Sequence, residues 1–89
     1  MPGVKTMAIE IMEAQLRAAL DTDGRLIERG CRTRAHLPSG VGIERGAAEV
    51  GVWHWNNGQF KLYVEGRGPV VTVDTVAEAV RYSREKLVR

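Results

Sequence analysis

The dipeptide Asn57-Gly58 constrains the fold of this chain most strongly, because it stands between two runs of β-forming residues, 50–56 and 59–65. Asn and Gly adopt the positive φ angles that both central positions of a type I′ turn require at low energetic cost. Two strands joined by such a turn form a tight hairpin. The sequence therefore predicts a β-hairpin with its turn at these two residues.

The register of this hairpin separates apolar from polar side chains. A two-residue turn pairs Trp55 with Phe60, Trp53 with Leu62 and Gly51 with Val64, so the large apolar residues share one face. A slip of one residue would divide them between both faces, so the pattern favours a turn of two or four residues. The opposite, wetter face then carries Val50, Val52, His54, Lys61, Tyr63 and Glu65. We expect a helix to cover the tryptophan face, because an isolated hairpin is only marginally stable.

A first helix is predicted over residues 6–20, which contain good helix formers and neither Gly nor Pro. Gly24 suits the end of this helix, and residues 1–5 are expected to be a loose lead-in. Alternation over residues 4–11 leaves a first strand as an alternative. The apolar helix face would consist of Ile9, Met12, Leu16, Ala19 and Leu20.

The C-terminal part predicts a short strand followed by a helix. Residues 66–69 form a turn signal, and Pro69 can stand at the first position of a strand over residues 70–73. Thr75 and Glu78 have the spacing of a capping box, in which each side chain satisfies a free backbone donor at a helix N-terminus. The buried helix face would consist of Val76, Ala79, Val80, Ser83 and Leu87.

The sequence predicts the secondary structure of residues 25–46 less clearly. Residues 25–29 suit a helical turn or a short strand, Pro38-Ser39-Gly40 is a turn signal, and residues 41–45 suit an edge strand. The segment is therefore expected to be a loop or a set of edge strands. The whole chain, residues 1–89, predicts a single α+β domain: an N-terminal helix, a three- or four-stranded antiparallel sheet, and a C-terminal helix packed on one sheet face.

Composition fits an ordinary globular domain, with 44% hydrophobic and 27% charged residues among 89. No apolar run approaches the roughly 18 residues of a membrane span, and residues 1–6 contain no hydrophobic signal core. The lone Cys31 excludes an internal disulfide and suits a reducing compartment. We therefore expect a cytoplasmic protein without membrane contact.

No residue pattern indicates catalysis, a cofactor or a metal. Cys31, His36 and His54 lack the close spacing of metal ligands. Ser39 lies in a turn without the strand and helix of a nucleophile elbow. The glycines of residues 40–46 do not match a dinucleotide-binding fingerprint. The sequence therefore predicts a protein that is not an enzyme.

Positive charge is concentrated in residues 24–45, where five arginines face only Glu28 and Glu44 in a chain of net charge +2. Arginine binds phosphates and carboxylates through its planar fork, although a GC-rich genome also favours this residue. The expected partner-binding residues are Arg25, Arg29, Arg32, Arg34 and Arg45, with Lys61 and Tyr63 on the wet hairpin face.

Two families resemble parts of the chain. Gly51-Val52-Trp53, Gly58-Gln59-Phe60 and Val73-Asp74-Thr75 with Glu78-Ala79-Val80 resemble the ethylene-response-factor and integrase type of DNA-binding domain, in which a three-stranded sheet enters the major groove. Residues 60–87, with Asp74-Thr75-Val76-Ala77-Glu78-Ala79-Val80, also resemble the end of HicB-type antitoxin domains. Both resemblances imply a hairpin, a third strand and a helix in that order.

These observations favour a small non-enzymatic binding module that acts on a macromolecular partner, foremost a protein, as antitoxins, phage or mobile-element inhibitors and adaptors do. An exposed sheet edge would offer a second route to a partner, including a second copy of the chain. The alternative is a nucleic-acid-binding domain that uses the wet sheet face and the arginine-rich segment.

Overall fold

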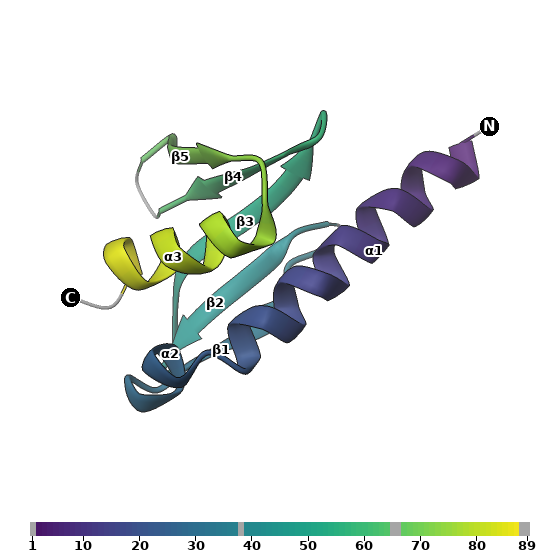
Figure 1. Cartoon of the computed structure of the whole chain (residues 1–89). Helices are drawn as coiled ribbons and strands as arrows, with labels where there is room; N and C mark the ends of the chain where they lie inside the picture. The colour runs from purple at the N-terminus through teal and green to yellow at the C-terminus, as the bar shows by residue number, and fades with distance from the viewer. Residues whose placement is uncertain (1, 38, 65–66, 88–89) are drawn as a thin grey trace.

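A computed structural model describes residues 2–37, 39–64 and 67–87, with side chains described from residue 8 onward. It contains three helices and five strands among these residues (Figure 1). In chain order they are α1 (Pro2–Asp21), α2 (Gly24–Glu28), β1 (Cys31–Ala35), β2 (Val41–Arg45), β3 (Ala48–Asn56), β4 (Gln59–Tyr63), β5 (Pro69–Val73) and α3 (Val76–Leu87).

The strands form one antiparallel sheet in the order β1-β2-β3-β4-β5, so that each strand pairs with its neighbour in sequence. Helices α1 and α3 lie together on one side of this sheet (Figure 1). The α+β class is confirmed, but the expected count of three or four strands was too low. The missing strand is β1, whose alternation of Cys31 and Thr33 with two arginines is short and mostly polar, as suits a sheet edge.

The central hairpin forms as predicted. Asn57 and Gly58 have φ angles of 51° and 78°, which are the positive values of a type I′ turn. Trp55 pairs with Phe60 and Trp53 with Leu62, as expected. The expected pair of Gly51 and Val64 does not form, because β4 ends at Tyr63.

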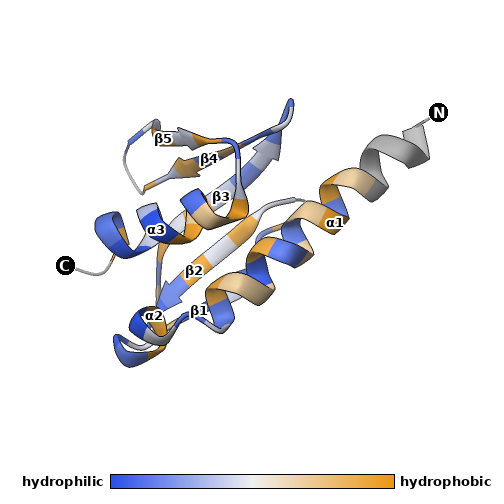
Figure 2. Ribbon diagram, in the orientation of Figure 1, coloured by the Kyte–Doolittle hydropathy of each residue, from blue (hydrophilic) through white to orange (hydrophobic). Residues whose placement is uncertain are grey.

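The hydrophobic core lies between the sheet and the two long helices. Trp53, Phe60 and Leu62 of the sheet, and Leu16 and Leu20 of α1, are each at most 2% exposed. Figure 2 shows hydrophobic residues alternating with polar ones along β2, whose Val41 and Ile43 belong to the same core. The alternation of the strands therefore directs one set of side chains toward the helices and leaves the other set opposite them.

Helix α1 confirms the predicted first helix, and the alternative of a first strand over residues 4–11 is wrong. The helix begins at Pro2, so residues 2–5 continue it instead of forming a loose lead-in. Proline is favoured at the first helical position, because its fixed φ suits a helix and the N–H that it lacks would be unpaired there.

Residues 25–46 are more regular than a loop. They contain most of α2 and all of β1 and β2. Strand β2 is not an edge strand as expected, because β1 pairs along its outer side. Of the predicted turn at 38–40, Pro38 lies outside the described residues, while Gly40 has a φ angle of 118° that favours glycine.

The predicted capping box forms in part at the start of α3, where the Glu78 carboxylate accepts from the Thr75 hydroxyl in place of the Thr75 backbone N–H. The backbone N–H of Glu78 donates to the Thr75 hydroxyl at 3.1 Å, and that hydroxyl donates to the Glu78 carboxylate at 3.1 Å. The predicted inner face is largely confirmed, since Ala79, Val80, Ser83 and Leu87 are buried and Val76 is half-buried. No helix in the described part of the chain is long and apolar enough to cross a membrane.

Candidate functional site

The side of the sheet opposite α1 and α3, here called the open face, is covered by no helix or strand among the described residues (Figure 1). Contacts on the other side fix this assignment. Trp53 reaches Ser83 of α3, and Thr33 reaches Arg17 of α1. By strand alternation, the open face carries Arg32, Arg34, Gly42, Glu44, Glu49, Val52, His54, Lys61, Tyr63 and Thr72.

A row of four residues crosses the middle of the open face. Arg34, Gly42, Val52 and Tyr63 lie opposite one another on β1, β2, β3 and β4 in turn. Val52 is only 9% exposed, although no helix covers it. The surrounding side chains therefore fold over the sheet here and form an apolar centre with a polar border.

Because Gly42 has no side chain, the side chains of Glu49 and Arg34 can occupy the space above it. A Cβ atom on Gly42 would lie 2.6 Å from the Glu49 Oε2 atom and 3.1 Å from the Arg34 Cγ atom. The side chains of Glu49 and Arg34 thus both approach the backbone of β2 at Gly42. Any larger residue at this position would displace the Glu49 carboxylate.

A register shift between β2 and β3 places two glutamates at opposite positions on the neighbouring strands. Glu44 pairs with Glu49 while Ile43 pairs with Gly51, which leaves Val50 as an extra residue on β3. Each carboxylate has a basic partner. Glu44 lies 2.9 Å from Arg34 and 3.7 Å from Arg32, and Glu49 lies 3.4 Å from the His36 Nδ1 atom.

The rings of His36, His54 and Tyr63 form a second row, which shares Tyr63 with the first row. The ring of His54 lies edge-on to that of His36, with centroids 5.6 Å apart, and edge-on to that of Tyr63, with centroids 5.3 Å apart. Burial lowers the pKa of His54, and the positive charge of a protonated His36 acts in the same direction, against the carboxylate of Glu13. His54 is therefore held in its neutral form more firmly than an exposed histidine.

The structure brings together four of the seven residues expected to bind a partner. Arg32, Arg34, Lys61 and Tyr63 share the open face. Arg25 and Arg29 lie at α2, and Arg45 ends β2 on the side of the sheet that faces the helices. The predicted surface patch is thus divided between two sides of the domain.

The sequence analysis did not identify the two glutamates of the open face, Glu44 and Glu49. Glu44 was counted only as one of two acidic residues in the arginine-rich segment, and Glu49 was assigned no role. Their placement depends on the register shift after Ile43, for which the local signal was Gly51, next to the extra residue Val50.

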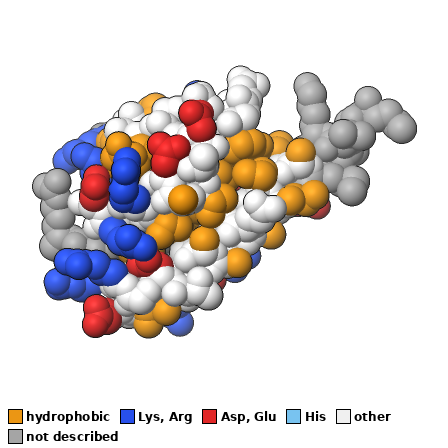
Figure 3. Space-filling view, viewed as in Figure 1, with side chains coloured by type: hydrophobic (Ala, Val, Ile, Leu, Met, Phe, Trp, Pro, Cys, Tyr) orange, Lys and Arg blue, Asp and Glu red, His pale blue; other side chains and the backbone are white. Residues whose placement is uncertain are grey.

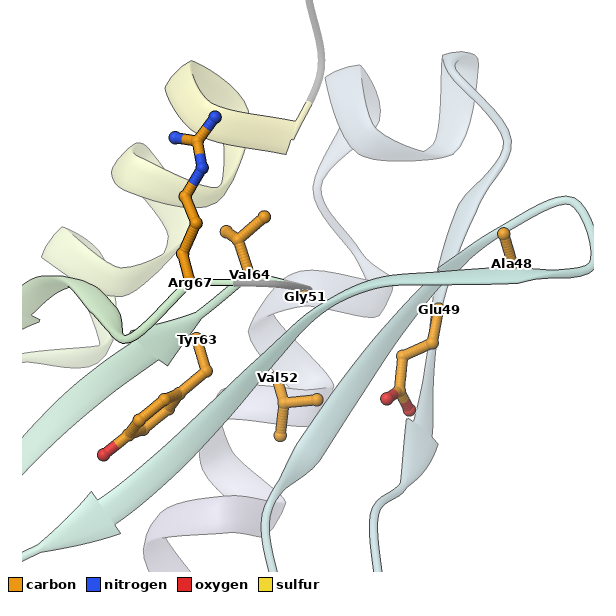
Figure 4. A pocket seen from close by; sticks show the side chains of 7 residues that line it. All are labelled: Ala48, Glu49, Gly51, Val52, Tyr63, Val64 and Arg67. Carbon is orange, nitrogen blue, oxygen red and sulfur yellow. The ribbon is translucent and has the colours of Figure 1, made fainter.

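A hollow opens where β3 and the chain after β4 separate (Figure 4). Its lining residues are Ala48, Glu49, Gly51, Val52, Tyr63, Val64 and Arg67. Figure 4 shows Glu49, Val52 and Tyr63 pointing to one side of the strands, and Val64 and Arg67 to the other. The hollow is therefore an opening at the end of a strand pair, unlike the concave pockets that enclose small ligands.

The helix side of the domain differs in character (Figure 3). Hydrophobic side chains gather between α1 and the strands, and Lys and Arg side chains gather at the end where α2 and the C-terminal half of α3 lie. Trp55 is half-buried there against Phe60, with ring centroids 4.6 Å apart, and it lines a shallow hollow with Ala8 and Ile9. Of the two tryptophans, only Trp53 is fully enclosed.

The described residues contain no group of three or more His, Cys, Asp or Glu side chains that could hold a metal ion. Cys31 is buried, and burial raises the pKa of its thiol against the opposing charge of Arg45. A raised pKa disfavours the thiolate, which is the reactive form of cysteine.

No protein-family model, curated protein or solved structure matches the chain. The two family resemblances therefore stay expectations from the sequence.

Proposed function

We propose that the chain is a non-enzymatic binding module that recognises a protein through the open face of its sheet. The observation that carries this proposal is the composition of that face, in which the nearly buried Val52 lies opposite Tyr63 on β4 and across Gly42 from Arg34 on β1. Protein interfaces typically combine such an apolar centre with a polar border, and they are enriched in Tyr and Arg.

The balance of charge supports a protein partner. Arg32 and Arg34 both lie within salt-bridge distance of Glu44, so part of their charge is already neutralised. Phosphate contacts depend on cations that displace counterions from the nucleic acid. Glu44 and Glu49, which lie beside the middle row, lower the net positive charge available to a phosphate backbone, whereas alternating charges suit a protein surface of complementary pattern.

The positions of the tryptophans support the same conclusion. Single-stranded nucleic acids bind exposed rings on which their bases stack. Trp53 is 0% exposed, and Trp55 lies on the opposite side of the sheet from Arg34 and Tyr63. On the open face the rings of His54 and Tyr63 stand edge-on to each other, so they do not form a flat stacking platform.

Affinity capture from the native host with two matched variants tests this proposal. Tyr63 lies on the open face, and Tyr82 is half-buried on α3 and packs against the core. We expect Tyr63→Ala to reduce the amount of captured protein at least about tenfold, the scale of one hot-spot residue. Tyr82→Ala should leave the capture unchanged, once thermal melting has shown that both variants fold.

A loss of capture with Tyr82→Ala alone would contradict the proposal. A gel-shift titration with single- and double-stranded DNA and RNA addresses the alternative of nucleic-acid binding. Affinity that falls about 10³-fold or more between about 50 and 200 mM salt would favour that alternative.

A further inference from the structure

The two outer edges of the sheet differ in their protection. At the β1 edge, the backbone N–H of Thr33 donates to the Asp21 Oδ1 atom at 2.9 Å, and the Thr33 hydroxyl donates to Oδ2 at 2.8 Å. The carboxylate that ends α1 therefore occupies the outward donor at the middle of the strand, and Arg32 and Arg34 add charge. Blocked donors and charged side chains are devices that keep an edge strand from pairing.

The β5 edge has neither device. Its sequence, Pro-Val-Val-Thr-Val, contains no charged residue. Among the described residues, no backbone group outside the sheet hydrogen-bonds to β5. In Figure 1, β5 is the outermost strand, and α3 turns back across the sheet away from this edge.

The register fixes which backbone groups of β5 point outward. In a two-residue hairpin the residues next to the turn form a hydrogen-bonded pair, and hydrogen-bonded and non-hydrogen-bonded pairs then alternate. Phe60 and Leu62 of β4 therefore direct their backbone groups to Val73 and Val71 of β5. Thr72, which lies between these two, directs its N–H and C=O groups away from the sheet.

We propose that two copies of the chain pair antiparallel through β5, with the two-fold axis at Thr72. A residue on such an axis faces its own copy, and the two copies of Thr72 would exchange both of their N–H···O bonds as one hydrogen-bonded pair. Val71 of each copy would lie opposite Val73 of the other. The strand is thus complementary to itself, which is the requirement of a two-fold interface.

The side chains suit this pairing on both faces of the joined sheet. The exposed Thr72 side chains meet on the open face, where threonine pairs across strands are favourable. The half-buried Val71 meets the buried Val73 on the helix side, which extends the apolar layer. The Lys61 side chains stand one strand further in on each copy, about 14 Å apart at ordinary strand spacing, so salt largely screens their repulsion. The joined sheet would present two open faces side by side.

Sedimentation velocity of the full chain over a range of concentrations tests this inference. We expect the mass to rise from the 9.8 kDa of one chain to twice that value. Thr72→Pro removes the outward N–H without touching the inward bonds of Val71 and Val73, so its mass should stay at that of one chain at every concentration. A chain that stays monomeric throughout would overturn the inference.

Charged substitutions of Thr72, the residue on the two-fold axis, show where the interface lies. They test the inference even if Thr72→Pro does not fold. Thr72→Glu places like charges opposite each other and should give a monomer, as should Thr72→Lys. An equimolar mixture of these two variants should recover the dimer, because opposite charges then face each other. Ala77→Glu on the exposed side of α3 is the control and should remain dimeric. A dimer that persists in Thr72→Glu alone would overturn the placement at β5.

Discussion

The indole N–H of Trp53 donates a 2.8 Å hydrogen bond to the hydroxyl of Ser83, thirty residues later in the chain. The same hydroxyl donates to the carbonyl oxygen of Ala79 at 2.8 Å, so Ser83 links β3 to the backbone of α3. Both side chains are 0% exposed. This contact holds α3 on the tryptophan side of the sheet and leaves the opposite face open.

Removal of the Ser83 hydroxyl should therefore destabilise the fold. Ser83→Ala would leave a buried indole N–H without an acceptor, which costs about 1–3 kcal/mol. Urea unfolding measures this loss, and Ser39→Ala at an exposed position serves as the control. In a Trp53→Phe background the same substitution should cost less, because no N–H remains to be satisfied. An equal loss in both backgrounds would show that the hydrogen bond does not contribute.

The stability of the fold should depend on the ionisation of Asp23. Its carboxylate accepts hydrogen bonds from Arg84 of α3, including one of 2.8 Å from Nε, and one of 3.1 Å from the backbone N–H of Leu26. The hydrogen bond from Arg84 lowers the pKa of Asp23 below its ordinary value of 3.8, with the Leu26 N–H adding to it and burial opposing it. A carboxyl whose pKa is lower in the folded state stabilises the fold above its unfolded pKa. That stability is lost as the pH falls through the folded value.

Asp23→Asn keeps a residue that can cap α2 but removes the charge. We expect its urea midpoint to lie below that of the wild type near pH 7, and the gap to narrow as the pH falls below the ordinary carboxyl pKa of 3.8 and through the lower folded pKa of Asp23. Asp74→Asn, at an exposed position, provides the comparison. A gap of constant size across this range would contradict the role of the Asp23 charge.

Substitution of Gly42 should alter the open face without unfolding the domain. In Gly42→Ala the new Cβ would force the Glu49 carboxylate aside, and this end of a flexible side chain can move. Stability should change by no more than about 1 kcal/mol, since alanine also restricts the unfolded chain. Capture of the protein partner should nevertheless fall, because the face changes shape. Gly58→Ala, in the hairpin turn, should show the opposite pattern. It should lower the stability, because the φ angle of 78° at this position strains an alanine, and it should leave the capture of the partner unchanged.

The capping box at α3 gives a separate test of how that helix is held. Thr75→Ala should destabilise the domain by about 1 kcal/mol, because the N–H of Glu78 loses its acceptor. Thr75→Ser retains the hydroxyl and should recover most of this loss in thermal melting. If Thr75→Ser is as unstable as Thr75→Ala, the hydroxyl is not the source of the effect.

The sequence predicted those elements whose determinants lie close together in the chain. The hairpin follows from Asn57-Gly58, and the inner face of α3 follows from its helical spacing together with the Thr75 cap. Strand β1 was missed because its pairing partner, β2, was itself read as an edge, and because alternating arginines resemble a solvated loop as much as an edge strand.

The same distinction applies to the candidate site. Lys61, Tyr63 and His54 were placed on the wet face correctly, since the hairpin register decides their orientation. The contacts of Glu49 with His36 and of Glu44 with Arg34 join residues 10 to 13 positions apart. They depend on the order of strands and on a register shift, neither of which local patterns specify.

The central claim is that partners bind the open face, and site-specific photo-crosslinking tests it most directly. A photoreactive benzophenone amino acid replaces Lys61 on the open face in one variant and Arg81, exposed on α3, in the other. Both variants are irradiated in extract from the native host. We expect the variant at position 61 to form a crosslinked species with one defined protein and the variant at position 81 to form none with that protein. A crosslink to the same protein from position 81 alone would contradict it.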